Sequence, residues 1–285
     1  NLYFSTSAEL DLTSFGAYNS FTNSVFPVTR QSAATAHNNN NNIDYIAYNF
    51  HSVDGYQKVD SYTGNGSASG PIVETGFEPA FIMIKRTDST EDWKIIDNKR
   101  NNFANSLEPN ESIAEENNNN SNFVPTSNGF QMNDIHGDYN ASGGEYIYLA
   151  IAADPDTTTP TVENSFDVVT YTGNGGTQSI DTDFKPDLVW VKGRVQNQHS
   201  GIFDSVRGAD LWLRSGTTDA ENNFGGGYGV TSFDTNGFTV GSGSAINNNG
   251  DGNVAWCWKA GDHDDNLPQI NTEGSIDSVV SVNAE

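Results

Sequence analysis

The chain has 285 residues, 35% of them hydrophobic, and its 37 acidic against 13 basic residues give a formal net charge of −24. So acidic a surface repels phosphate backbones and anionic lipids, which argues against nucleic-acid binding and against binding to a membrane surface. No apolar run reaches the roughly eighteen residues that a membrane span requires, so we expect no membrane insertion.

The first part of the chain matches only the later half of a module that recurs downstream. The segment Asp44–Tyr48 lies 101 residues before a similar segment, Glu145–Leu149. We therefore expect residues 1–54 to be the C-terminal half of a truncated module.

Two complete copies of the module follow. Six sequence blocks recur in the same order, with offsets of 106 to 109 residues. The clearest are Tyr62–Gly66, which recurs as Tyr171–Gly175, and Thr75–Lys85, which recurs as Thr182–Lys192. Self-similarity of this kind indicates that one fold is repeated along the chain.

Short strands bounded by turn residues fill each copy. In the later copy the apolar run Leu188–Lys192 predicts a central strand that is shielded on both faces. Asp234–Gly237 predicts a tight hairpin whose Asn-Gly pair adopts a primed turn. No window of helical length has the apolar spacing of an amphipathic helix. We expect an all-β fold of tandem antiparallel β-sandwich modules, with a jelly-roll-like topology favoured over an immunoglobulin-like one.

The expected domain organisation follows from the repeat. It consists of a truncated module at 1–54, a second β-sandwich module at 55–157, a third at 162–262, and a linker strand toward a further module at 263–285. The asparagine tracts at 38–42, 117–120 and 247–249 are predicted to be long surface loops.

One charged pair recurs in both complete copies, as Asp97-x-x-Arg100 and as Asp204-x-x-Arg207. A bidentate contact between such side chains can lock the loop that follows a strand. The alternative is a contact to an anion or a sugar. Because equal chemistry in two copies is what an architectural element predicts, we interpret both pairs as structural braces.

Trp212 is the tryptophan that we most expect to be exposed, because loop residues flank its Asp-Leu-Trp-Leu-Arg segment. An exposed indole can stack on a sugar ring, so Trp212 is a candidate surface contact. Cys257 lies in an apolar run and is instead predicted to be a small core residue.

No pattern typical of a catalytic, cofactor or metal site is found. The acidic segment Asp262–Asp265 lacks the ligand spacing of a calcium loop, so a solvated linker is favoured there. The motifs of serine hydrolases, phosphate-binding loops, dinucleotide folds and zinc peptidases do not occur. We therefore predict no catalytic residue, no cofactor and no metal, and a protein that is not an enzyme.

Several blocks of the later copy resemble a repeated module that is common in long virion proteins of tailed phages of marine bacteria and cyanobacteria, often called tail fibres. The segment 62–154 is similar to a variant of that module which sits beside it in such proteins. The matching blocks are Tyr171–Gly175, Phe184–Lys192, Asp204–Gly208, Thr231–Gly241 and Val254–Gly261.

The resemblance implies a phage virion structural protein, located in the extracellular particle, that serves as a tail fibre or adhesive appendage contacting the host surface. It implies other virion proteins as partners, a homo-oligomer with a trimer favoured, and a host surface glycan as a candidate ligand. It supplies no catalytic residues. Two alternatives stay open: a capsid or tail decoration protein without a receptor role, and a polysaccharide-degrading spike.

Overall fold

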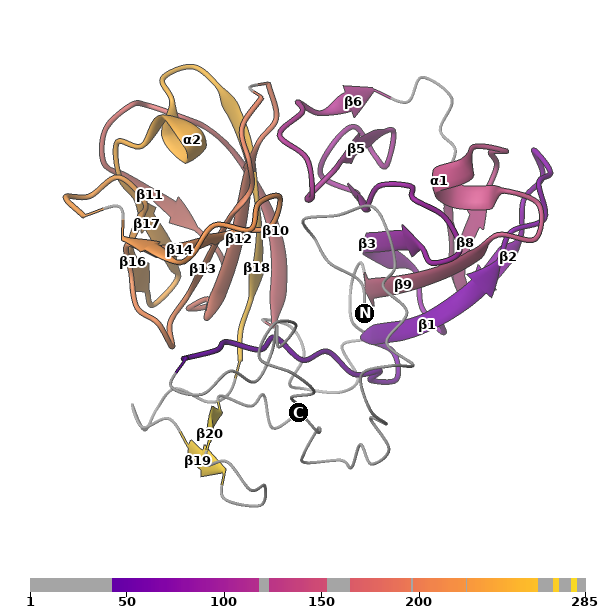
Figure 1. The fold of residues 1–285 in the computed structure, drawn as a ribbon, viewed down its shortest axis with the longest axis horizontal. Coiled ribbons are helices and arrows are strands. Elements are labelled where there is room, and N and C mark those ends of the chain that lie inside the picture. The colour runs from indigo at the N-terminus through magenta and orange to yellow at the C-terminus, as the bar shows by residue number, and fades with distance from the viewer. Residues whose placement is uncertain are drawn as a thin grey trace.

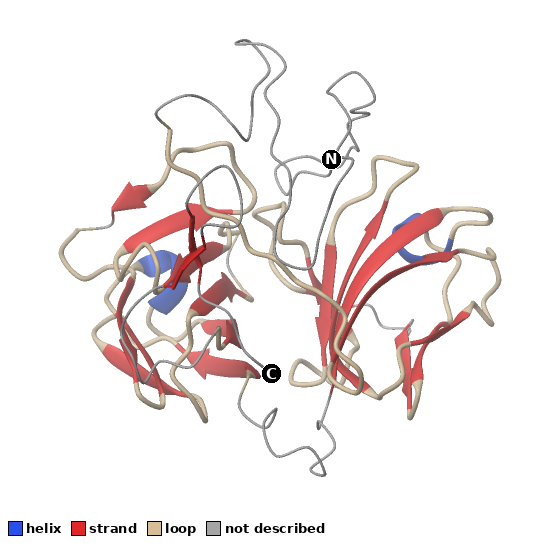
Figure 2. Ribbon diagram, turned by 90° about the horizontal axis from the view of Figure 1, so that it is seen from below, coloured by secondary structure: helices blue, strands red, loops and turns tan. Residues whose placement is uncertain are grey.

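The structure is a computed structural model. It describes residues 43–117, 123–152, 165–195, 197–223, 225–260, 269–271 and 278–280. Two strand-rich modules lie side by side (Figures 1 and 2), which confirms the predicted all-β fold of tandem antiparallel sandwiches. We call them the β1–β9 module and the β10–β18 module. No helix among these residues is long and apolar enough to cross a membrane.

Each module pairs a six-stranded sheet with a three-stranded sheet, among the described residues. In the β1–β9 module the large sheet has the order β1 (Gln57–Thr63), β9 (Glu145–Ala152), β3 (Pro79–Arg86), β4 (Lys94–Asp97), β5 (Asn105–Leu107) and β6 (Glu116–Asn117). Its small sheet has the order β2 (Ile72–Glu74), β8 (Gly129–Met132) and β7 (Phe123–Thr126).

The β10–β18 module repeats this order strand for strand. Its large sheet contains β10 (Phe166–Thr172), β18 (Gly252–Trp258), β12 (Leu188–Gly193), β13 (Gly201–Asp204), β14 (Leu211–Arg214) and β15 (Asn222–Asn223). Its small sheet contains β11 (Gln178–Asp181), β17 (Gly237–Val240) and β16 (Val230–Asp234). Two short helices, α1 (Gly137–Asn140) and α2 (Ser244–Asn247), precede the last strands at equivalent positions.

The strands are nested as the predicted jelly-roll-like topology requires. In both modules the first strand pairs with the last, the last also pairs with the third, and the second pairs with the next to last. The middle strands continue the large sheet, so the small sheet has three strands where a jelly roll divides eight strands between two sheets.

Each module has its own hydrophobic core between its two sheets. Burial of apolar side chains on the inner faces is the main favourable term for each fold. Fully buried residues of the first core include Ile82, Ile84, Phe130, Met132, Tyr146 and Ala150. Those of the second include Val189, Val191, Phe203, Phe238, Val240 and Cys257. Cys257 is thus the core residue that its sequence context predicts, and burial raises the pKa of its thiol.

The predicted hairpin at Asp234–Gly237 forms, but the predicted turn type is wrong. The positive φ of 147° falls on Gly237, and neither central residue of the turn is among the described residues with a positive φ. A Cβ atom at Gly237 would lie 2.0 Å from the carbonyl oxygen of Ile180. At the equivalent Gly129 it would lie 2.0 Å from the carbonyl oxygen of Val73. Close approach of the neighbouring strand therefore explains why this glycine recurs.

A buried asparagine ties together the turns at the end of each module. Asn247 accepts a hydrogen bond from the Asn174 backbone N–H at 2.9 Å and donates to the carbonyl oxygens of Gly176 and Gly241 at 2.6 and 2.7 Å. Asn140 makes the matching contact to the Asn65 backbone N–H at 2.7 Å. The loop prediction for 247–249 is therefore wrong at Asn247, which lies in α2 and is fully buried.

Replacing Asn247 with alanine is expected to lower the free energy of unfolding by about 1–3 kcal/mol. The Asn174 N–H and the carbonyl oxygens of Gly176 and Gly241 would lose their hydrogen-bond partner. Urea unfolding followed by tryptophan fluorescence measures the loss. Asn249 is exposed and provides the matched control, for which we expect a change within about 0.5 kcal/mol. Equal losses at the two positions would contradict the assigned role.

Past the second module, a ladder forms where a single linker strand was predicted. β19 (Gln269–Asn271) and β20 (Ser278–Val280) pair antiparallel. Of the predicted truncated module, residues 43–54 are described. The asparagine tract 38–42 and the acidic segment Asp262–Asp265 lie outside the described residues, as does 118–120.

Candidate functional site

The outer faces of the two large sheets pack against each other in a third apolar cluster, which we call the intermodule cluster. It contains Phe81, Ile95, Leu107, Leu149 and Ile151 from the first module and Val168, Leu188, Trp190, Ile202, Val254, Trp256 and Trp258 from the second. The ring of Phe81 lies 6.2 Å from Trp256 and 5.9 Å from Trp258.

Because side chains alternate between the two faces of a strand, one strand can contribute both to the core of its own module and to the intermodule cluster. On β3, Ile82 faces the core of its own module while Phe81 faces the other module. On β18, Cys257 faces its own core while Trp256 faces across. A solvated sandwich face would alternate apolar with polar residues, so apolar residues on both faces are the sequence signal of this interface.

The predicted brace of the first module stands at the end of β4. Arg100 donates from Nε to Asp97 Oδ2 at 2.7 Å and from Nη2 to the carbonyl oxygen of Ile95 at 3.0 Å. Both charged side chains are completely buried. The loop that follows has positive φ at three consecutive residues, Asn101, Asn102 and Phe103. Such backbone is costly for residues other than glycine, so a bonded anchor at its start is needed.

The second brace has the same bonds. Arg207 donates from Nε to Asp204 Oδ2 at 2.5 Å and from Nη2 to the carbonyl oxygen of Ile202 at 3.0 Å. Each arginine also reaches a glutamate for which the sequence predicts no role. Arg100 Nη1 lies 3.4 Å from Glu115, and Arg207 Nη1 lies 3.1 Å from Glu221.

The second module covers the first brace. Trp256 Nε1 donates to Asp97 Oδ2 at 3.0 Å, and Arg100 lies 5.5 Å from the centre of the Trp256 ring. Arg194 donates two hydrogen bonds to Glu115, at 2.7 and 2.9 Å. Burial raises the pKa of Glu115, but the bond from Arg194 and the charge of Arg100 outweigh it and lower the pKa overall. The brace thus bonds both within its module and across to the neighbour.

Lys192 is a buried cation at the same surface. Its Nζ donates to the carbonyl oxygens of Glu111 at 2.7 Å and Gln198 at 3.1 Å. Removal from water lowers its pKa from 10.5 to about 8, although the charges of Glu108 and Glu111 partly oppose this.

The Lys192 shift predicts that stability rises with pH in a defined window. Because the folded-state pKa is the lower one, the unfolded chain binds more protons between about pH 8 and 10.5, and the unfolding free energy grows there. At roughly 1.4 kcal/mol per pKa unit, the gain over the whole window is on the order of 3–4 kcal/mol. Urea unfolding at pH 7.5 and 9.5 measures the lower part of it, below the ionisation of tyrosine. Lys192→Met should remove the slope, and an unchanged slope in that variant would contradict the assignment.

The prediction that Trp212 is a surface contact is wrong, because its side chain is 3% exposed. Trp212 lies on β14, and alternation along this strand turns its ring into the core of the second module. There it stacks on Phe203 with ring centres 6.2 Å apart, and Arg214 lies over it at 4.5 Å.

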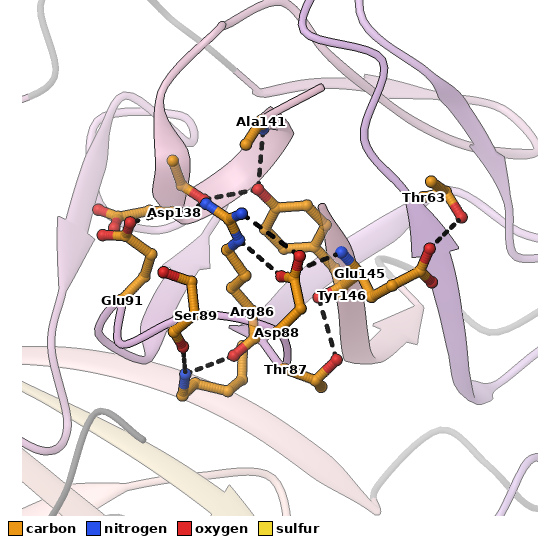
Figure 3. Close-up of polar contacts among 12 residues, drawn as sticks. Thr63, Arg86, Thr87, Asp88, Ser89, Glu91, Asp138, Ala141, Glu145 and Tyr146 are labelled. Atoms are coloured by element: carbon orange, nitrogen blue, oxygen red, sulfur yellow. Dashed lines mark hydrogen bonds and ion pairs between the residues drawn. The ribbon is translucent and has the colours of Figure 1, made fainter. Parts of the chain in front are cut away.

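A polar cluster at one end of the first module contains a pair of carboxyl groups (Figure 3). Arg86 donates from Nε to Asp88 at 2.7 Å, and its Nη1 lies 3.7 Å from Glu91. Burial, together with a hydrogen bond to Asp138, raises the pKa of Glu91. Glu91 and Asp138 share a hydrogen bond. Their carboxyl groups are therefore closer together than the two catalytic carboxyl groups of glycosidases, which lie roughly 5 Å or more apart. The described residues include no group of three or more His, Cys, Asp or Glu side chains placed to hold a metal.

Comparison with known proteins finds one family. Its model, described as "Domain of unknown function (DUF7483)", matches residues 2–155 and 162–285. These two ranges contain the two modules of identical strand order. No curated protein and no solved structure matches the chain.

Proposed function

The chain belongs to the DUF7483 family, and we propose that this member is a structural protein of a phage virion, used in a tail fibre or another adhesive appendage. The proposal rests on the resemblance of its repeated blocks to modules of tailed-phage fibre proteins. Its partners are other virion proteins and, at the host surface, a glycan. A homotrimer is the expected assembly.

The packing of the modules supports this proposal. The structural observation that supports it is the covered brace, where Trp256 of one module bonds to Asp97 of the other beside an apolar cluster that both share. Domains joined only by a linker reorient freely. Neighbouring modules fixed by such contacts hold one orientation, and a stiff appendage requires that property of its building units.

Charge is also compatible with this role. A net charge of −24 keeps the surface soluble and resists non-specific adhesion to nucleic acid released during infection. Recognition of a neutral or cationic group on a host glycan would not be opposed by this charge.

Immunogold electron microscopy of phage particles that carry this chain tests the proposal. We expect antibodies against the chain to label a tail appendage and to reduce adsorption to host cells. Label spread over the capsid would instead support a decoration protein. Release of saccharide from host polysaccharide by the purified chain would support a degrading spike, and unlabelled particles would overturn the virion assignment. Light scattering of the purified chain should give three times its mass of 30.8 kDa.

A further inference from the structure

The second brace is also covered, but by a different part of the chain. Tyr48 donates from its hydroxyl to Asp204 Oδ2 at 2.6 Å, and Arg207 Nη2 donates to the Tyr48 hydroxyl at 3.2 Å. Tyr48 belongs to the segment 43–56, drawn in indigo in Figure 1, which runs beneath the modules and leads into β1.

Tyr48 and Trp256 occupy the same position in two copies of the module. The sequence Ile46-Ala47-Tyr48-Asn49-Phe50 matches Val254-Ala255-Trp256-Cys257-Trp258 on β18. Both ring systems donate a hydrogen bond to the same carboxylate atom, Oδ2, of a brace that is not in their own copy. One contact thus occurs twice, in two different pairs of copies.

We propose that the brace is a docking site for another copy of the module, and that it selects an aromatic hydrogen-bond donor at the position that Trp256 holds on β18. The donor is an indole N–H at Trp256 and a phenol O–H at Tyr48. This inference concerns how the copies assemble and stands whether or not the protein belongs to a virion.

The position of Leu149 gives the assembly a direction. Leu149 is the equivalent of Trp256 in the first module, and its side chain carries no donor. If the two modules were related by a simple two-fold axis, Leu149 would face Asp204 as Trp256 faces Asp97. Tyr48 holds that place instead. The last strand of the β10–β18 module therefore docks on the β1–β9 module, and the segment 43–56 docks on the β10–β18 module.

The three equivalent positions meet in one place, which fits a cyclic order. Leu149 and Trp256 both lie in the intermodule cluster, and Tyr48 packs against it. Two residues further along, Phe50 lies 5.9 Å from Trp258, its own equivalent in the β10–β18 module. The strands β9 and β18 and the equivalent segment around Tyr48 therefore converge on a single apolar cluster.

Exchanging the residues that the copies use at this position tests the inference in the full chain. Hydrogen exchange of residues 204–208, in which the amides of Ser205, Arg207 and Gly208 are hydrogen-bonded, reports docking when measured by mass spectrometry. Tyr48→Leu installs the residue of the first module, and we expect exchange at least about tenfold faster, because a bond to a charged group is lost. Tyr48→Trp installs the residue of the β10–β18 module, and we expect exchange within about threefold of the parent, since the donor is kept.

The same two kinds of substitution at Trp256, which bonds to the Asp97–Arg100 brace, test whether the effect at Tyr48 is general to both braces. Trp256→Tyr should keep the exchange of residues 95–100 near that of the parent, whereas Trp256→Leu should accelerate it. Circular dichroism confirms that each variant retains its sheets. Slow exchange in Tyr48→Leu, or equally fast exchange in Tyr48→Leu and Tyr48→Trp, would overturn the inference.

Discussion

Replacing Asp97 with alanine is expected to lower the free energy of unfolding by about 3–5 kcal/mol, because it leaves a fully buried guanidinium without its ion-pair partner. Asp97 and Arg100 are both inaccessible to solvent, so water cannot replace the lost carboxylate. The remaining acid, Glu115, is 3.4 Å from Arg100 and is shared with Arg194. Asp97 also accepts from Trp256, so one substitution breaks bonds in both modules. Urea denaturation measures the loss.

Asp204→Ala is the matched control, since it removes the same bond from the other brace. There the Arg207 side chain is 10% exposed and its second partner, Glu221, is 41% exposed. Water can solvate part of that guanidinium, so we expect a smaller loss, about 1–3 kcal/mol. A loss at Asp97 no greater than that at Asp204 would contradict the view that the intermodule surface makes the first brace the more costly one to break.

Trp256→Ala is expected to cost about 3–5 kcal/mol, the range found when large core side chains are truncated. Trp256 is fully buried although it points away from the core of its own module. Its removal opens a cavity between the modules and leaves Asp97 without one donor. Hydrogen exchange should therefore accelerate on the facing strands β3 and β4 of the other module, although these strands are far from Trp256 in the sequence.

Trp212→Ala separates this effect from a general loss of stability. Trp212 is equally large and 3% exposed, but it packs inside its own module. We expect a similar cost to the β10–β18 module and little change in the exchange of β3 and β4. Equal acceleration of those strands by both substitutions would argue that the modules unfold together for reasons other than this contact.

The sequence predicts the local features of the fold well. Strand positions such as the fully buried β12 follow from apolar runs between turn residues, and these signals are local. The repeat strengthens these predictions, because each sequence block occurs in both modules and can be compared with its copy. Asp97 and Arg100 are identifiable as a brace for the same reason, since the two residues lie three positions apart and their spacing recurs.

Contacts that join distant segments could not be predicted in this way. Trp256 and Asp97 are 159 residues apart, and an apolar outer face gives no indication of what covers it. Trp212 was expected to be exposed because loop residues flank its segment, yet β14 pairs with β13 and the ring packs in the core of its module. The role of Asn247 depends on backbone groups in two separate turns, around Asn174–Gly176 and at Gly241, which no single stretch of sequence reveals.

The exchange rate of the Trp256 indole proton, followed by NMR in deuterated water, tests the account most directly. Docked modules bury this proton in a bond to Asp97, so we expect it to persist long after exposed amides have exchanged, and to exchange much faster in the Asp97→Ala variant. An indole proton at Trp256 that exchanges as quickly as one in solvent would mean that the modules do not dock through the brace.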